Sequence, residues 1–303
     1  MKFGKVTHPE LVEFTLPPDH PDTLRVLNAS KSERNLEVFV GCAKWNRSDL
    51  KGFYPRGTKD ELSYYSRQFN AIEMNATFYK MPDWKQVETW KNKTPEGFRF
   101  FPKVTDLITH YRRLINVQEP IENFCDAISN FENRLGMVFM QLHENFAPKD
   151  FDRLKGVLEQ FPKAIPLAVE VRNEAWFADQ EISRQYTALL EQLNMSNILV
   201  DTAGRRDMLH MRLTSPAAFI RYVGANHSSD TKRLDEWVER IAEWKEQGLQ
   251  QLYFFVHQNV EVESPLLAAH FISRLNQKLG LSLHIPEKPG DSSSDFSQRS
   301  LFD

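Results

Sequence analysis

The chain has 303 residues, of which 41% are hydrophobic and 26% are charged, a composition ordinary for a soluble protein with a sizeable core. The formal net charge of −3 argues against nucleic-acid binding through overall positive charge, although binding through a local basic cleft is still an alternative. No apolar run approaches the roughly 18 residues of a membrane span, and the amino terminus has no signal-peptide core, so we expect a cytoplasmic protein. Cys42 and Cys125 lie in different predicted elements, which favours two reduced, buried thiols over a disulfide.

The composition changes along the chain and predicts three segments. Residues 1–35 are polar and rich in proline, and we expect an extended arm that packs on the rest of the protein through Phe14 and Leu16. Residues 36–285 carry a regular repeat of apolar runs. Residues 286–303 contain Lys-Pro-Gly and three consecutive serines, a composition that predicts a flexible tail.

Eight short apolar runs read as buried strands, and helical stretches separate most of them. The runs are Val38–Cys42, Ala71–Asn75, Phe100–Lys103, Met137–Gln141, Leu167–Arg172, Ile198–Asp201, Phe219–Arg221 and Leu252–Asn259. Their spacing of about 20 to 40 residues is the repeat expected of a TIM-barrel-like (β/α)8 barrel, in which ligands bind at the carboxyl ends of the strands. The stretch His210–Pro216 has no convincing helical pattern, so the helix between the sixth and seventh strands should be missing or incomplete.

Period-two alternation decides which side chains point into the barrel. In the second strand Ile72 and Met74 should contact the helices, which turns Glu73 inward. The same argument for the other strands gives a polar set that converges at the mouth of the barrel. Its predicted members are Glu73, Asn75, Lys103, Gln141, Glu170, Arg172 and Arg221, with Asp201 and His257 as weaker members.

Two interpretations of this set stay open. In the first, the charges are structural ion pairs that close the barrel mouth, such as Glu73 with Arg221 or Glu170 with Lys103. In the second, they form an enzyme site for an anionic or polyhydroxylated small molecule. Arg172 and Arg221 would clamp the anion, Glu73 or Glu170 would be the acid or base, and Lys103 would stabilise charge.

Weaker signals surround the same strand ends. His110 follows the third strand as a candidate proton shuttle, and the aromatic residues Trp45 and Tyr79 follow the first and second strands, where they suit contact with a substrate. We predict no cofactor, because phosphate loops, dinucleotide fingerprints and compact metal-ligand motifs are absent. A divalent metal bound by the acidic residues with His257 is the remaining alternative.

These segments resemble the YecE-like family, a family of unknown function. The resemblance spans about residues 36–280 and rests most on the block Glu73-Met74-Asn75-Ala76-Thr77-Phe78-Tyr79, with Gly41-Cys42-Ala43-Lys44-Trp45 and Val169-Glu170-Val171-Arg172 in support. It implies a TIM-barrel-like fold and no established reaction. Where the family usually shows Leu-His-Gly after the seventh strand, this chain has Tyr222-Val223-Gly224, so the missing histidine would be replaced by His257 or His227 or by different chemistry.

The carboxyl-terminal residues Gln298-Arg299-Ser300-Leu301-Phe302 resemble the pentapeptide that binds the bacterial sliding clamp. A tail of this kind orders on binding, with Leu301 and Phe302 in an apolar groove and Gln298 fixing the register. The alternative function is therefore an accessory protein of DNA replication or repair that the clamp recruits, with a nuclease-like or nucleotide-binding barrel. A non-catalytic binding barrel is the third possibility.

Overall fold

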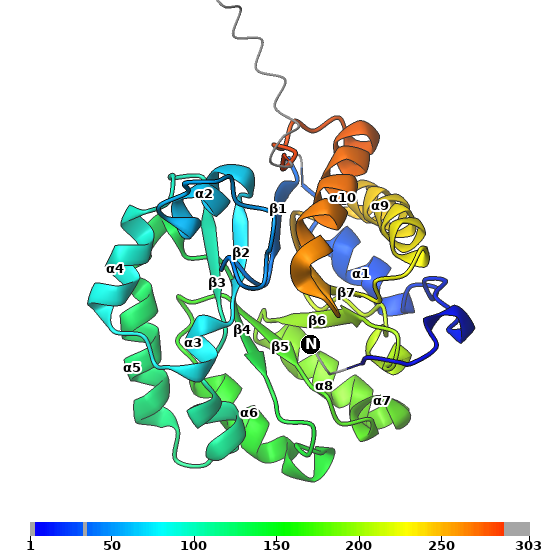
Figure 1. Cartoon of the computed structure of the whole chain (residues 1–303). Coiled ribbons are helices and arrows are strands. Elements are labelled where there is room, and N and C mark those ends of the chain that lie inside the picture. Colours follow the sequence, from blue (N-terminus) through cyan, green and yellow to red (C-terminus); the bar gives the residue numbers. More distant parts are fainter. Residues whose placement is uncertain (1–3, 33–34, 288–303) are drawn as a thin grey trace, which may run out of the picture.

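The protein is a single eight-stranded parallel barrel surrounded by helices. A computed structural model describes residues 4–32 and 35–287. Figure 1 looks into the barrel, with the strands inside and the helices outside. In chain order the strands are β1 (Glu37–Cys42), β2 (Ala71–Met74), β3 (Arg99–Pro102), β4 (Val138–Gln141), β5 (Leu167–Glu170), β6 (Ser196–Asp201), β7 (Ala217–Gly224) and β8 (Gln251–Gln258). The strand repeat predicted from the sequence is confirmed.

Each strand except β6 is followed by at least one α-helix before the next strand or the end of the described chain. The long helices are α2 (Glu61–Gln68), α4 (Trp84–Asn92), α5 (Gln118–Ser129), α6 (Phe151–Gln160), α8 (Gln180–Gln192), α9 (Ser229–Gln247) and α10 (Ser264–Leu279). Two single-turn helices, α3 (Ala76–Tyr79) and α7 (Ala175–Ala178), directly follow β2 and β5. Aspartates begin three of the long helices, because the side chains of Asp60, Asp83 and Asp179 accept hydrogen bonds from backbone N–H groups of the first turn.

The sheet order β3-β2-β1-β8-β7-β6-β5-β4 leaves one seam, between β3 and β4. Backbone contacts partly close this seam, with the Gly136 N–H donating to the Phe100 carbonyl at 2.7 Å and the Val104 N–H donating to the Phe139 carbonyl at 2.9 Å. Bulky aromatic side chains fill the interior below the mouth. They are Phe101, Phe139, Phe219, Tyr253 and Phe255. The interior of the barrel is therefore packed, as in other barrels of this type, and is not an open channel.

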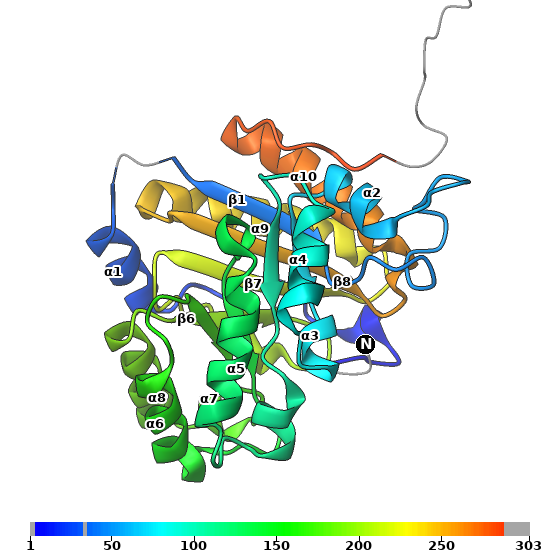
Figure 2. The same cartoon turned by 90° about the vertical axis from the view of Figure 1, so that its left-hand side faces the viewer.

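The amino-terminal arm is not extended throughout, because it contains the helix α1 (Pro21–Ala29). The predicted anchors Phe14 and Leu16 are buried as expected. In α1, the hydroxyl of Thr23 donates to the Met211 carbonyl at 2.8 Å and accepts from the Leu213 N–H at 3.0 Å. Figures 1 and 2 place α1 beside α9, at the side of the barrel formed by β6 and β7.

The contacts of α1 are with the connection that lacks a barrel helix. The connection between β6 and β7 has only the three-residue 3-10 helix η5 (Arg206–Met208), which confirms the predicted gap in the helical ring. The helix α1 is hydrogen-bonded to that connection through Thr23, and its Val26 and Leu27 side chains are buried. Sequence periodicity missed α1 because it is nine residues long and begins with a proline in a proline-rich stretch.

Three further observations concern the whole chain. Cys42 and Cys125 are free and buried, as predicted. Within residues 4–32 and 35–287, none of the helices is long and apolar enough to cross a membrane. The predicted clamp-binding residues Gln298, Leu301 and Phe302 lie outside the described residues.

Candidate functional site at the mouth of the barrel

A layer of buried charges lies above the aromatic interior. Arg221 of β7 is at its centre and is 1% exposed. Its Nε and Nη2 atoms donate to the two carboxylate oxygens of Glu73 at 2.8 and 2.9 Å, and its Nη1 atom donates to Glu170 Oε2 at 2.6 Å. One guanidinium from β7 thus joins carboxylates from β2 and β5, which no local sequence contact would bring together. The bidentate geometry is the strongest form of this ion pair.

On the β2 side, two further side chains bind Glu73. The amide of Asn75 donates to Glu73 Oε1 at 2.9 Å, and His257 Nε2 lies 2.9 Å from Glu73 Oε2. Because a carboxylate only accepts hydrogen bonds, this contact requires a proton on Nε2 of the imidazole. His257 Nδ1 has no hydrogen-bond partner within the described part of the chain, and Glu261 Oε1 lies 4.0 Å away.

On the β5 side, Glu170 is connected to a lysine through an amide. Arg172 Nε donates to Glu170 Oε1 at 2.5 Å, and Gln141 Nε2 donates to the same oxygen at 2.8 Å. Gln141 Oε1 in turn accepts from Lys103 Nζ at 2.8 Å. The ion pair between Glu170 and Lys103 that the sequence offered as one alternative is therefore replaced by a chain with Gln141 in the middle.

The charges change one another's acidity. Burial alone raises the pKa of Glu170, but Arg172 and Arg221 outweigh burial and lower it to about 2. The pKa of Glu73 is held well below its ordinary value, because Arg221 and His257 outweigh its burial. Both carboxylates are therefore ionised at neutral pH and accept hydrogen bonds only. This argues against the predicted role of either group as a proton donor.

The pKa values of Lys103 and His110 are lowered as well, but for these basic groups a lower pKa favours the neutral form. Burial, Arg221 and Arg172 together lower the pKa of Lys103 from 10.5 to about 7. Burial and the neighbouring Lys103 lower the pKa of His110 to about 4, so His110 is neutral at physiological pH. The ammonium of Lys103 lies 3.8 Å from the centroid of the Phe78 ring, and the His110 ring contacts the same Phe78 edge-on. Of these two groups, Lys103 is the one whose pKa lies near neutral pH.

A cavity of about 650 Å3 opens above this layer. From the predicted set it is lined by Asn75, Tyr79, Lys103, His110, Gln141, Arg172 and His257. Glu73, Glu170 and Arg221 do not line it and lie underneath. The lining holds four lysine and arginine side chains (Lys44, Lys51, Lys103 and Arg172) and two carboxylates (Asp49 and Glu261), a formal excess of two positive charges when the histidines are counted as neutral. A space of this size accommodates a small organic molecule.

Two predicted residues do not join the site. Trp45 packs edge-on against Trp90 at 6.4 Å between ring centroids, so its ring belongs to the packing behind the cavity wall. Asp201 points to the opposite side of β6, where Arg233 Nη2 donates to its Oδ1 at 2.7 Å and Trp237 Nε1 donates to its Oδ2 at 2.8 Å. Its expected role in binding substrate at the mouth is therefore not supported by its position.

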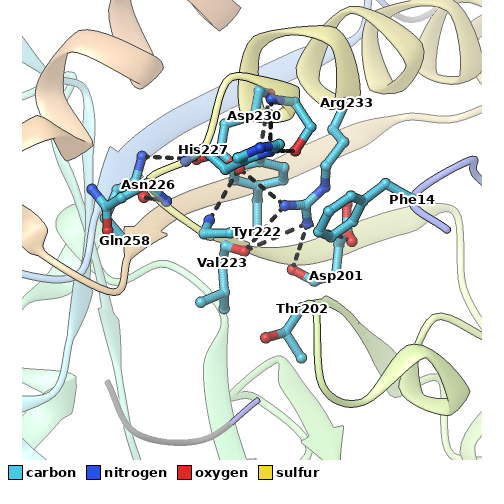
Figure 3. A network of polar contacts seen from close by, with 12 residues as sticks. Phe14, Asp201, Thr202, Tyr222, Val223, Asn226, His227, Asp230, Arg233 and Gln258 are labelled. Carbon is cyan, nitrogen blue, oxygen red and sulfur yellow. Dashed lines mark hydrogen bonds and ion pairs between the residues drawn. The ribbon is translucent and has the colours of Figure 1, made fainter. Parts of the chain in front are cut away.

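Figure 3 shows the second network, to which Asp201 belongs. The guanidinium of Arg233 lies between the rings of Phe14 and Tyr222, at 4.3 and 4.5 Å from their centroids. His227 is also here, with its backbone N–H donating to Asp230 Oδ2 at 3.2 Å. This network fixes the amino-terminal arm to the barrel. Of the two histidines offered as replacements at the mouth, only His257 is there.

Sequence reasoning missed the loops that complete the cavity wall. Residues of the connection after β1, including Lys44, Asp49 and Lys51, form one side, and Asn259 and Glu261 after β8 form another. Asn259 shares the strand parity of His257 and could have been found by extending the alternation by one step. The loop after β1 carries no periodic pattern from which its position could be read.

The candidate metal ligands do not come together. Among the described residues, no group of three or more histidine, cysteine, aspartate or glutamate side chains is placed to hold a metal ion. Asp201 lies on the far side of β6 from Glu73, Glu170 and His257, and both glutamates are engaged by arginines.

Comparison with known proteins identifies the family. Residues 39–290 match the family described as "Protein of unknown function DUF72". The chain belongs to the DUF72 family. The UPF0759 protein YecE of Escherichia coli K12 is 25% identical over 278 residues, which cover 84% of this chain and 99% of YecE. The UPF0759 protein YunF of Bacillus subtilis 168 is 28% identical over 151 residues, covering 46% of this chain and 52% of YunF.

Solved DUF72 structures share the fold. A DUF72 protein from Thermotoga maritima MSB8 superposes with a TM-score of 0.62 at 25% identity, covering 79% of this chain and 99% of that one. A second, from Enterococcus faecalis V583, gives a TM-score of 0.64 at 18% identity, covering 82% of this chain and all of that one. The predicted family and the TM-barrel-like fold are both confirmed, and the DUF72 description assigns no reaction.

Proposed function

We propose that this DUF72 protein is an enzyme that binds a small anionic substrate in the cavity at the barrel mouth. The observation that carries the proposal is Lys103. This residue is 6% exposed and lines a cavity of about 650 Å3, and its amine is hydrogen-bonded to a neutral amide, while the carboxylates of the site are bound by arginines. Burying an ammonium beside two arginines is energetically unfavourable, and such groups are often found at functional sites. An anionic ligand in the cavity would compensate the positive charge.

The roles of the two glutamates differ from those expected at first. Glu73 and Glu170 are positioning residues in this proposal, because each is fully buried, ionised and fixed by Arg221. Glu170 orients Arg172 and Gln141 at the cavity wall, and Glu73 orients His257. Lys103 and Arg172 supply positive charge to the substrate.

His257 is the candidate general base. A carboxylate behind one ring nitrogen fixes the tautomer and leaves the other nitrogen to accept a proton, an arrangement that recurs in acid–base catalysis. His257 Nδ1 and Asn259 Oδ1 both belong to cavity-lining residues, and both lack a hydrogen-bond partner in the described ranges. Buried polar atoms in native proteins are rarely left unpaired, so these two atoms support a polar ligand in the cavity.

A thermal-shift screen tests the proposal. The panel holds sugar phosphates, di- and tricarboxylates, nucleotides, neutral oligosaccharides, divalent cations and short DNA. A ligand at 100 times its dissociation constant should add about 2.7 kcal/mol to the free energy of unfolding.

The variant Lys103→Met removes the charge and keeps the length of the side chain. Lys155→Met is the matched control, because Lys155 is 49% exposed on the outer helix α6. We expect an anionic class to stabilise the wild type and Lys155→Met equally and to stabilise Lys103→Met clearly less. No shift with any anion, or the same shift in all three proteins, would overturn the proposal.

A further inference from the structure

We propose that the side-chain amine of Lys103 forms an imine with the carbonyl group of an anionic aldehyde or ketone bound in the cavity. This inference rests on the proposed function above and names its substrate class. It also assigns to Lys103 a covalent role in addition to the electrostatic one.

The first support is the geometry around the amine. Lysines at protein surfaces and interfaces commonly pair with carboxylates, and such a pair keeps the amine protonated. Here Gln141 lies between Lys103 and the carboxylate of Glu170. The amide NH2 group of Gln141 donates to Glu170, and the amide oxygen of Gln141 accepts from Lys103. In the part of the chain described, Lys103 makes no ion pair with an acidic side chain within 4.0 Å.

The second support is the combination of burial with nearby cations. Lys103 is buried at the cavity wall, and its burial, Arg221 and Arg172 together disfavour a positive charge on the amine. The pKa of about 7 leaves a large fraction of the amine unprotonated at neutral pH, which is the state in which an amine is a nucleophile. Arg172 at the same cavity wall would hold a carboxylate or phosphate of the substrate.

The reaction balances without an additional reagent. The nitrogen lone pair of Lys103 attacks the carbonyl carbon, the C–N bond forms, and the carbonyl π electrons move to oxygen. The nitrogen loses a proton and the oxygen gains one, giving a carbinolamine, and loss of one water molecule gives the imine. His110 is neutral at physiological pH and lines the same cavity, so it is placed to accept the first proton and return it to the leaving oxygen.

Reductive trapping with matched ligand pairs tests the inference. The full-length protein is incubated with glyoxylate or glyceraldehyde phosphate in the presence of cyanoborohydride, which reduces an imine to a stable secondary amine. Peptide mass spectrometry then locates the adduct. Glycolate and glycerol phosphate carry the same charges without the carbonyl and serve as binding controls in parallel thermal-shift measurements.

We expect the Lys103 peptide to be modified at least about tenfold faster than the Lys155 peptide. Each fall of one unit in the amine pKa raises the unprotonated fraction at neutral pH about tenfold, and only the unprotonated amine reacts. An excess of the matching non-carbonyl anion should protect Lys103 and leave Lys155 unaffected. Modification of Lys103 no faster than of Lys155, while glycolate or glycerol phosphate still stabilises the wild type, would overturn the imine and leave the anion site standing. Absence of both modification and stabilisation would overturn both.

Discussion

Replacing Glu170 by glutamine should reveal how strongly the buried network stabilises the fold. Glutamine has the shape of the protonated acid, so Glu170→Gln removes the charge that binds Arg172 and Arg221. The pKa of Glu170 is about 2 in the folded protein and 4.5 ordinarily. At about 1.4 kcal/mol for each pKa unit, this difference corresponds to roughly 3 kcal/mol of stability. Because the folded pKa is depressed, the contribution is fully present above pH 4.5 and is lost as the pH falls toward 2.

The assay is the free energy of unfolding from urea titrations at a series of pH values. We expect Glu170→Gln to be about 3 kcal/mol less stable than the wild type at pH 7, with the difference shrinking as the pH falls toward 2. Glu181→Gln is the control. Arg184 and Gln185 lower the pKa of Glu181 to about 2 as well, but its side chain is 56% exposed, and solvent screens its interactions. Parallel pH profiles for wild type and Glu170→Gln would refute the reasoning.

Three further predictions concern other parts of the molecule. The pKa of Lys103 is about 7 in the folded protein and 10.5 ordinarily, so between pH 7 and 10.5 the unfolded chain binds more protons than the folded chain. The free energy of unfolding of the wild type should therefore rise relative to that of Lys103→Met over this pH range. Urea titrations in which the two proteins stay parallel would contradict this prediction. Asp201→Asn should cost about 3 kcal/mol by breaking a buried ion pair with Arg233, while ligand-induced thermal shifts stay as in the wild type, and a lost shift would return Asp201 to the site. A peptide of residues 292–303 should bind the bacterial sliding clamp in fluorescence anisotropy, with Leu301→Ala/Phe302→Ala abolishing it, and no binding at tens of micromolar peptide would end the clamp hypothesis.

The barrel and most of the mouth could be predicted because the side chains of a strand alternate between two faces, so there are only two ways to assign them to the inside and the outside of the barrel. On β2 the apolar pair Ile72 and Met74 fixes the outer face, so Glu73 must point inward. On β6 the pattern is ambiguous, because Ile198 and Val200 are as apolar as Leu199. Ile198 and Val200 fill the barrel interior, which turns Asp201 outward.

The pairing of the charges needed the three-dimensional structure. The sequence places glutamates on β2 and β5 and an arginine on β7, but it does not reveal that Arg221 spans both. It also cannot show that Gln141 separates Lys103 from Glu170. The two interpretations left open at first are therefore not exclusive. Arg221 and the glutamates form the structural network of the first interpretation, and the cavity above them supports the site of the second.

The helix within the arm and the position of the Trp45 ring were not predicted, for a related reason. A short helix such as α1 is stabilised by the surface it covers, and that surface belongs to the β6–β7 connection nearly two hundred residues later in the chain. An aromatic residue after a strand is equally suited to the mouth or to the helix layer. The partner that decides between them for Trp45 is Trp90 on α4.

The most direct test of the central claim is the dissociation constant of the best anionic ligand, measured by isothermal titration calorimetry. If the cavity binds an anion through Lys103, removing one charge-assisted hydrogen bond in Lys103→Met should weaken binding about tenfold or more. Lys155→Met should stay within about twofold of the wild type, as expected for an exposed charge. Equal dissociation constants for the wild type and Lys103→Met would contradict the account and leave the barrel mouth as a structural ion network.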